Sequence, residues 1–420
     1  MQISTNEFLL GSLNDMLNQQ SNINQLNREI ATGQTMLDAS ADPAGASAAI
    51  GDAAAIGRFN YDSGNATAAT SSLQNGLSAL QQVTTLLDQL NQTAVQAASA
   101  GTTASDRQSL TASAQAAQQQ LMQLANTTGP NGGYLFGGTL TNGPPFSAQA
   151  NGEVVFNGDA GTNQVEIAPS LTVPSTVSGD GIFTNIPAGD DGVAVTADAA
   201  NTGAGYAVAE GVTNISQLTA ARLGGTQYQI GFASAAGGNL SYTVTSGVGA
   251  PGSAGFSATS GVVASGAFSP DSDLTFGGVD IKINGMPAAG DSFDVATGAT
   301  TSMFQVVQNL ISALQTAPAD AASNAQFQQQ IENAIAGIGG AQTSALSAQA
   351  TIGSVLSEIQ AVQGQDTTQN TNAQAQLSDL QSANLPQVIA NYSESVTALQ
   401  AAQLAFAKVQ GLSLFDFIQA

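Results

Sequence analysis

The chain has 420 residues, enough for about two to four domains, and 42% of them are hydrophobic but only 8% charged. Its 29 acidic and 6 basic residues give a net charge of −23, which argues against binding to nucleic acid or to an anionic membrane, because both require clustered Lys and Arg. Cys and His are absent, which excludes disulfides, thiol nucleophiles, imidazole bases and the common zinc sites.

Apolar residues at heptad-like spacing begin near the N-terminus. They are Leu9, Leu13, Met16, Ile23 and Ile30, separated by steps of 4, 3, 7 and 7. This spacing predicts a helix with a coiled-coil-like stripe that also contains polar positions. Gly33 is expected to end the helix, and Asp42-Pro43 to begin the next one, because Pro suits the first helical turn.

Two further helical segments follow before residue 130. Leucines at 73, 77, 80 and 87 repeat at steps of three, four or seven and predict a long helix. Gly101 interrupts this pattern. Thr103 or Ser105 is expected to cap a third helix that reaches Ala125.

The middle of the chain reads differently. Short alternating runs at residues 153–156, 164–167, 227–230, 241–244 and 280–283 are bounded by Gly, Asn, Asp or Pro, which is typical of antiparallel β-structure. The segment from Gly138 to Asp320 holds 14 acids and 2 bases and so carries −12 of the −23 charges. A helix is expected near residues 302–314, where the chain returns to helical patterning.

The C-terminal part mirrors the N-terminal part. Residues 327–368 are rich in Ala and Gln and predict a long helix. A regular spacing of three and four follows at Leu385, Val388, Tyr392, Ser395, Leu399, Ala402, Phe406 and Val409. The sequence therefore predicts an α+β protein, in which both chain ends form an elongated helical rod and the middle forms a β-rich head.

We call the eleven apolar positions at the two ends the terminal seam: Leu9, Leu13, Met16, Ile23, Ile30, Leu385, Val388, Tyr392, Leu399, Phe406 and Val409. Two interpretations are open. The seam either packs within one molecule as the core of a helical bundle, or it packs between subunits of a polymer. Because chain ends usually fray in a monomer, their regular patterning favours packing between subunits.

Motifs that could carry chemistry are weak. Gly247-Val248-Gly249-Ala250-Pro251-Gly252 matches a dinucleotide fingerprint, but no helix is expected after it, so a plain β-connection is the better interpretation. Acids at 271, 273, 291 and 294 form a solvated acidic region, with a weak Ca²⁺ site as the alternative. No base accompanies a serine nucleophile, and no pair of carboxylates stands out, so we predict no enzyme activity, no metal and no cofactor.

Several segments resemble the flagellin superfamily. They are Met1-Gln2-Ile3-Ser4-Thr5, Ile30-Ala31-Thr32-Gly33-Gln34 and Ser40-Ala41-Asp42-Pro43-Ala44-Gly45-Ala46. Two others are similar to the hook-associated branch that forms the junction between hook and filament. One contains Tyr134, Leu135 and Phe136, with Pro145-Phe146 after it, and the other contains Leu414, Phe415 and Asp416 near the C-terminus.

The resemblance implies a flagellin-like division of the chain. Residues 1–42 and 376–420 would form an inner-core coiled-coil domain, residues 43–130 and 302–375 the helical rod, and residues 131–301 the outward-facing β-rich head. It also implies a structural role at the hook–filament junction. The implied partners are a hook-associated protein on the hook side, flagellin on the filament side, copies of the chain itself and an export chaperone.

The resemblance also implies a location outside the cell, on the flagellum. The N-terminus has no basic patch and no apolar run of a secretory signal, and no segment is apolar enough to span a membrane. Delivery to that location is therefore expected to need no cleaved signal. The alternative within the superfamily is a filament subunit. From another class, a surface module whose β head binds glycan is the competing hypothesis.

Overall fold

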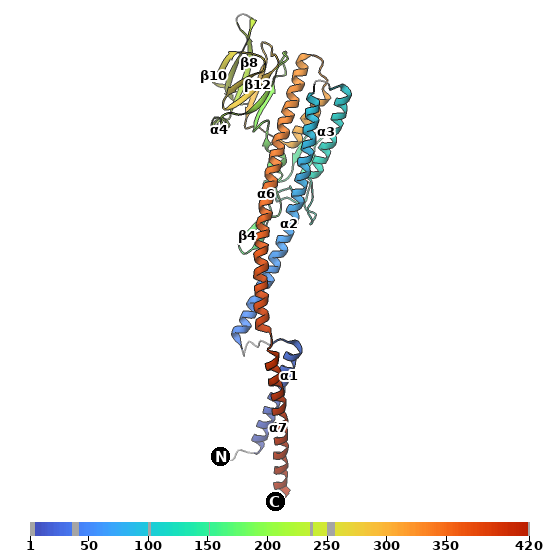
Figure 1. Cartoon of the computed structure of the whole chain (residues 1–420), viewed down its shortest axis with the longest axis vertical. Helices are drawn as coiled ribbons and strands as arrows, with labels where there is room; N and C mark the ends of the chain where they lie inside the picture. Colours follow the sequence, from blue (N-terminus) through green and yellow to red (C-terminus); the bar gives the residue numbers. More distant parts are fainter. Residues whose placement is uncertain are drawn as a thin grey trace. The chain divides into compact units, whose positions relative to one another are not determined.

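The computed structural model describes residues 5–35, 42–99, 102–150, 152–235, 238–249 and 257–418. The chain divides into two compact units. Unit 1 contains Met1–Gly64 and Val362–Ala420, and unit 2 contains Asn65–Ala361. Figure 1 shows the elements of both units along the chain.

Helices occupy both ends of the chain. In order they are α1 (Thr5–Thr32), α2 (Pro43–Ala98), α3 (Ala104–Ala125), α4 (Ile215–Leu223), α5 (Met303–Gln315), α6 (Ala321–Gln381) and α7 (Leu385–Ile418). In unit 1, α1 packs along α7. The predicted helices of both ends are therefore present, although α2 and α6 are each longer than the apolar pattern that indicated them.

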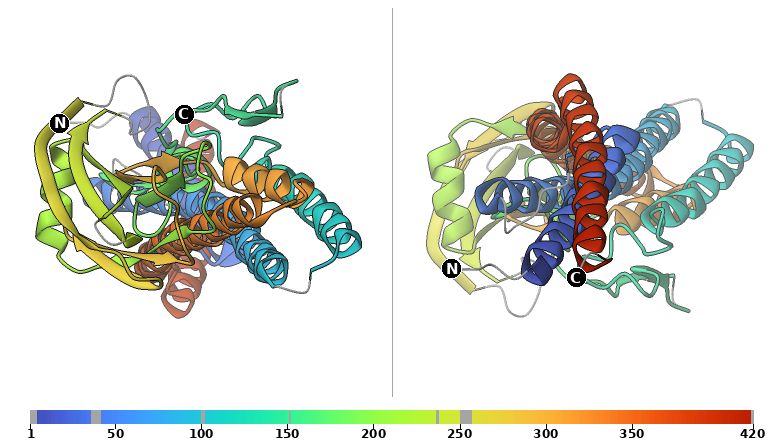
Figure 2. Two further views of the ribbon diagram at one scale, coloured as in Figure 1. Left: turned by 90° about the horizontal axis from the view of Figure 1, so that it is seen from above. Right: turned by 90° about the horizontal axis from the view of Figure 1, so that it is seen from below.

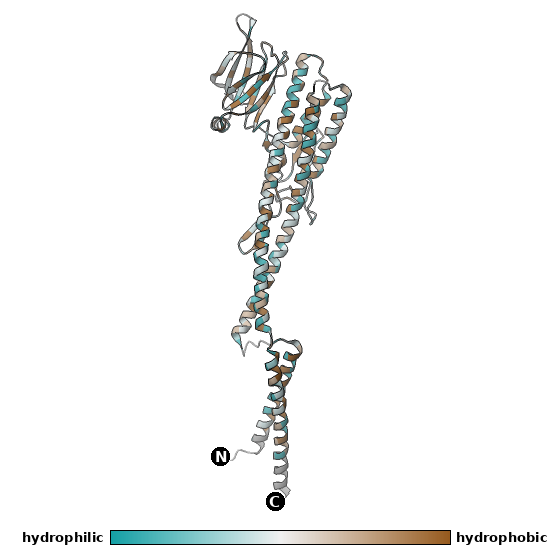
Figure 3. Ribbon diagram, in the orientation of Figure 1, coloured by the Kyte–Doolittle hydropathy of each residue, from teal (hydrophilic) through white to brown (hydrophobic). Residues whose placement is uncertain are grey.

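In unit 2, α2 and α6 are linked by both apolar and polar side chains. Leu80 and Leu87 of α2 and Ile352 of α6 are buried. The side-chain amide of Gln349 donates to the Leu80 carbonyl at 3.2 Å and to the Thr84 hydroxyl at 2.8 Å. Hydrophobic and hydrophilic residues alternate along both helices in Figure 3, as expected for helices that bury one face.

Short strands and an aromatic cluster follow α3. The strands are β1 (Phe146–Ala148), β2 (Val154–Phe156), β3 (Gln164–Ala168), β4 (Leu171–Pro174) and β5 (Ile186–Pro187), with a π-helical turn η1 (Asp180–Thr184) between β4 and β5. Phe146 lies at the centre of the cluster. Its ring centroid is 5.2 Å from that of Phe183 and 5.4 Å from that of Phe304 on α5. Edge-on and tilted ring pairs of this kind stabilise beyond the area they bury.

The remaining strands form two sheets that share one hydrophobic core, and we call them together the β head. The larger sheet has the order β10-β9-β8-β13-β6 and the smaller has the order β11-β12-β7, each with antiparallel neighbours. Ile230, Phe293 and Ile281 are fully buried between them. Helix α4 packs on β8 and β13, at the flank of the curved larger sheet (Figure 2). The strand bounds are β6 (Val193–Ala197), β7 (Tyr206–Val212), β8 (Thr226–Ser234), β9 (Leu240–Val248), β10 (Ser257–Ala267), β11 (Ser272–Phe276), β12 (Val279–Asn284), β13 (Ser292–Thr297) and β14 (Thr300–Thr301), the last pairing with β5.

One buried amide joins the β head to α6. The side chain of Gln329, only 3% exposed, accepts a hydrogen bond from the Ala207 amide at 2.7 Å. Its own amide donates to the carbonyls of Ala207 at 2.8 Å and Val195 at 3.3 Å. Ala207 lies on β7 and Val195 on β6, which are edge strands of the two sheets. Gln329 therefore satisfies edge groups that no neighbouring strand reaches.

Candidate assembly surface

The terminal helices α1 and α7 pack on each other within the same molecule. Met16, Ile23 and Ile30 are half-buried on α1, and Tyr392, Leu399 and Phe406 are half-buried on α7, where Val388 is 8% exposed. A seven-residue repeat of such positions is the pattern of a paired-helix stripe. Part of the terminal seam is thus covered inside one chain, as the intramolecular interpretation expected.

Polar groups lie among these apolar positions. The Gln19 amide donates to the Ser395 carbonyl at 3.4 Å across the two helices. Glu29 is only 7% exposed and accepts a hydrogen bond from the Gln25 amide at 3.2 Å. Polar residues in a helical stripe lower its stability but specify its register.

Backbone contacts close the pair where α1 ends and α7 begins. Gly33 has a φ of +70°, a conformation that glycine adopts without strain, and its amide donates to the Glu29 carbonyl at 2.8 Å. The Thr35 amide then donates to the Gln381 carbonyl at 2.7 Å, and the Ala383 amide to the Gly33 carbonyl at 3.0 Å. These bonds join the turn after α1 to the turn before α7.

A second set of apolar side chains remains uncovered on the same two helices. Leu13 and Leu385 of the terminal seam are 46% and 39% exposed. Four neighbours outside the predicted seam are also exposed: Leu10 at 62%, Leu17 at 57%, Ile389 at 49% and Leu404 at 68%. We call these six residues the exposed apolar set. Concentrated exposure of large apolar residues on two helices is typical of a binding surface. The backbones of Leu9 and Val409 are helical, but their side chains lie outside the description.

Two of the motif residues form a helix start. The Asp42 carboxylate accepts a hydrogen bond from the Gly45 amide at 2.9 Å, and its carbonyl accepts one from the Ala46 amide at 3.1 Å. Pro43 is the first residue of α2. Asp42-Pro43 therefore begins the helix as expected, with a carboxylate at the positive end of the helix dipole.

The other motif residues are placed by packing. Leu135 is 4% exposed and Phe136 is fully buried, with its ring centroid 5.2 Å from that of Phe183. Tyr134 is half-buried and bridges to Thr128 through the backbone. These three residues build the interior of unit 2. Leu414, Phe415 and Asp416 belong to α7, and their side chains lie outside the description.

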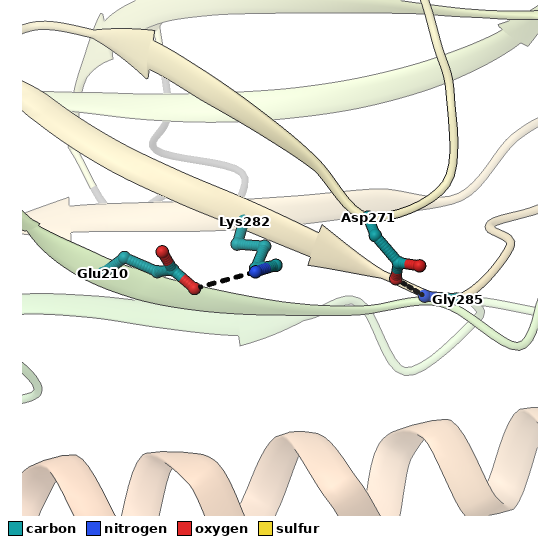
Figure 4. Close-up of polar contacts among 4 residues, drawn as sticks. All are labelled: Glu210, Asp271, Lys282 and Gly285. Carbon is teal, nitrogen blue, oxygen red and sulfur yellow. Dashed lines mark hydrogen bonds and ion pairs between the residues drawn. The ribbon is translucent and has the colours of Figure 1, made fainter.

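The acidic residues considered as an ion site have separate structural roles. Asp291 is 3% exposed and accepts hydrogen bonds from three backbone amides, those of Thr202 and Ala288 among them. Asp271 accepts from the Gly285 amide at 3.4 Å (Figure 4). Among the described residues, no three acidic side chains gather where they could hold a metal ion.

A single basic side chain stands on the smaller sheet. Lys282 of β12 lies 3.3 Å from the Glu210 carboxylate of β7 (Figure 4). The hydrogen bond and charge of Glu210 raise the pKa of Lys282, with smaller contributions from Asp273 and Asp271. Because both partners are substantially exposed, this pair adds little to stability. The nucleotide-like glycine motif ends β9 at Val248, and its last three residues lie outside the described part of the chain.

A cavity in unit 2 has no side chain suited to acid–base chemistry. It has a volume of about 540 Å³ and is lined by apolar and hydroxyl residues of unit 2, among them Leu73, Thr176, Ile182, Ser347 and Ile352. None of its lining residues is ionisable. The arrangement can accommodate apolar groups but supplies no general acid or base.

Comparisons with known proteins point to one group. Residues 3–141 match the bacterial flagellin N-terminal helical region. Over 186 residues the chain is 31% identical to flagellar hook-associated protein 3 of Escherichia coli K12, a match that covers 44% of this chain and 58% of that protein. The chain is similar to the flagellar hook-associated proteins. It thus matches less than two thirds of the length of this curated relative.

Solved structures extend the similarity over most of the chain. The crystal structure of flagellar hook-associated protein 3 from Legionella pneumophila has a TM-score of 0.70 and 26% identity, covering 77% of this chain and 96% of that one. FlgL from Xanthomonas campestris has a TM-score of 0.65 and 27% identity, covering 78% and 98%. The predicted α+β, flagellin-like fold is confirmed, and the similarities agree with the predicted resemblance to flagellar hook-associated proteins.

The relatives are named as parts of the flagellum, which agrees with the prediction that the chain is not an enzyme. Among the residues that the structure describes, no helix combines the length and the apolar character that a membrane span needs.

Proposed function

We propose that this chain is a structural component of the bacterial flagellum that joins the hook to the flagellin filament. The proposal is supported by the similarity to hook-associated protein 3 and by the exposed apolar set on α1 and α7. The chain would contact a hook-associated protein on one side, flagellin on the other, and copies of itself. An export chaperone would hold it before delivery outside the cell without a cleaved signal.

The observation that carries the proposal is the uncovered part of the terminal helices. A folded monomer rarely leaves six large apolar residues exposed on two paired helices, because their burial is favourable by about 25 cal/mol per Å². Neighbouring subunits would cover them. In this proposal the half-buried seam residues hold α1 to α7, and the exposed apolar set forms the contacts between subunits.

Labelling of intact flagella tests this assignment. A single labelled band at the hook end of each filament is expected for a junction component. Continuous label along the filament would instead identify a filament subunit, and label confined to the cell surface would contradict a flagellar role. A variant in which Leu223, an 86% exposed residue of α4, carries the label leaves the residues of α1 and α7 unmodified.

A further inference from the structure

Two carboxyl groups in unit 1 are buried without a partner. Asp62 on α2 is 4% exposed and Asp366 on α6 is 7% exposed. The Oδ2 atom of each is shielded from solvent and accepts no hydrogen bond. Burying a polar group without a hydrogen bond is costly, and burying an ionised carboxylate is far more costly.

The two helices are close at this level. The Asn370 amide of α6 donates to the Asn60 side-chain oxygen of α2 at 3.0 Å. Asp62 lies two residues after Asn60, and Asp366 lies four residues before Asn370, one helical turn away along antiparallel helices. The two carboxyl groups therefore stand at facing levels of α2 and α6.

Compensating positive charge is limited here. Arg58, one turn before Asp62, is exposed, and its guanidinium lies 5.3 Å from the centroid of the Phe59 ring. The only ion pair found among the described residues is Lys282–Glu210, which belongs to unit 2. Burial raises the pKa of Asp366, the charge of Asp62 raises it further, and Arg58 lowers it in part. Two like charges that share a buried position are not readily ionised together.

We propose that Asp62 and Asp366 form a proton-binding site that fastens α2 to α6. One bound proton converts one carboxyl group into a donor, which then gives its hydrogen to the Oδ2 atom of the other carboxylate. The bond satisfies both orphaned oxygens and removes one of the two like charges. The inference does not depend on the proposed flagellar role.

The raised pKa of Asp366 determines how the stability contributed by this pair changes with pH. In the unfolded chain the pKa of an Asp side chain is near 3.8. Since the folded value is raised, the folded chain binds more protons between the two values. The contribution of this pair to stability is then greatest at acidic pH and falls as the pH rises through that window.

Hydrogen exchange on the full chain tests the proposal. The wild type is compared with Asp366→Asn and with the control Asp379→Asn. Asp379 is an exposed residue of the same helix. After correction for intrinsic exchange rates, wild-type amides of α2 and α6 beside the pair are expected to lose about tenfold in protection between acidic and neutral pH. Asp366→Asn removes the charge and keeps the higher protection at neutral pH. Asp379→Asn behaves as wild type.

Two results would overturn the proposal. One is a loss of protection at neutral pH in Asp366→Asn, since the ionised carboxylate would then be stabilising. The other is protection that CaCl₂ raises in the wild type at neutral pH but not in Asp366→Asn, because the pair would then bind a cation rather than a proton.

Discussion

At the scale of single residues, the Gln329 amide is the polar contact on which the attachment of the β head to α6 depends most. It accepts a hydrogen bond from the Ala207 amide and donates to the carbonyls of Ala207 and Val195. Buried edge groups of a sheet have no alternative partner once this amide is removed.

We expect Gln329→Met, which keeps the length of the side chain but removes the amide, to lower the free energy of unfolding by about 1–3 kcal/mol. Gln330→Met, at the exposed neighbouring position, is the matched control and should change it little. Chemical denaturation followed by circular dichroism measures both. Equal stability of the two variants would contradict the role assigned to Gln329.

Residue roles of this kind were not predictable from the sequence. The acids at 271 and 291 were expected in a solvated acidic region, yet Asp291 is buried and binds backbone amides. A carboxylate in a glycine-rich segment reads the same whether water or a distant loop amide is its partner. The burial of Asp62 and Asp366 gave no sequence signal either. Asp366 stands among small and polar residues, and Asp62 follows Tyr61, which is itself exposed.

At the scale of elements, the start of α3 shows how a local signal is resolved. Both Thr103 and Ser105 were candidates for its cap. Thr103 holds the position, since its hydroxyl accepts from the Asp106 amide and the Asp106 carboxylate accepts from the Thr103 amide. These hydrogen bonds from Thr103 lower the pKa of Asp106.

Thr103→Ala is expected to destabilise the chain by about 1 kcal/mol, whereas Ser105→Ala should be nearly neutral. The contribution of Asp106 is present above its ordinary pKa and is lost as the pH falls through the lowered value. Thermal unfolding of both variants at neutral pH is the measurement. A larger effect from Ser105→Ala would show that the cap is misassigned.

The pair α1–α7 allows packing within and between molecules to be separated. Met16 of α1 is half-buried, while its neighbour Leu17 is 57% exposed. We expect Leu17→Gln to block polymer formation but leave the thermal unfolding of the monomer unchanged. Met16→Gln should loosen the monomer as well.

Light scattering reports polymer formation and circular dichroism reports unfolding, so the two variants can be compared directly. Normal polymer growth by Leu17→Gln would contradict the proposed contact between subunits.

Long helices were the most predictable elements, because heptad spacing repeats over many turns. Helix α4 was missed, although Asn214, whose side chain accepts from the Ser216 and Gln217 amides, is a recognisable cap signal. Its nine residues are too short for a clear period among strands. Apolar spacing also shows which face of α1 is sticky but not which helix covers it, which is why the two interpretations of the terminal seam stayed open.

At the scale of the whole molecule, the β head has a hydrophobic core made of its own residues. The strands of the β head lie between residues 193 and 297, and none of the described side chains of α7 belongs to its core. Deleting residues 380–420 is therefore expected to leave the β head folded but to abolish assembly.

Hydrogen exchange of the head strands and sedimentation of polymer measure the two effects of this deletion. Loss of protection in the head strands would argue against independent cores, and polymer formed by the truncated chain would argue against a role for α7.

Helix α1 meets its partner only across almost the full length of the sequence: the bond from Gln19 to Ser395 spans 376 positions. Closing so large a loop is slow compared with local folding. Whichever terminal helix becomes available first therefore stays unpaired until the other is available. The α1–α7 pair can therefore form only when both ends of the chain are present, and a copy truncated before α7 cannot form it.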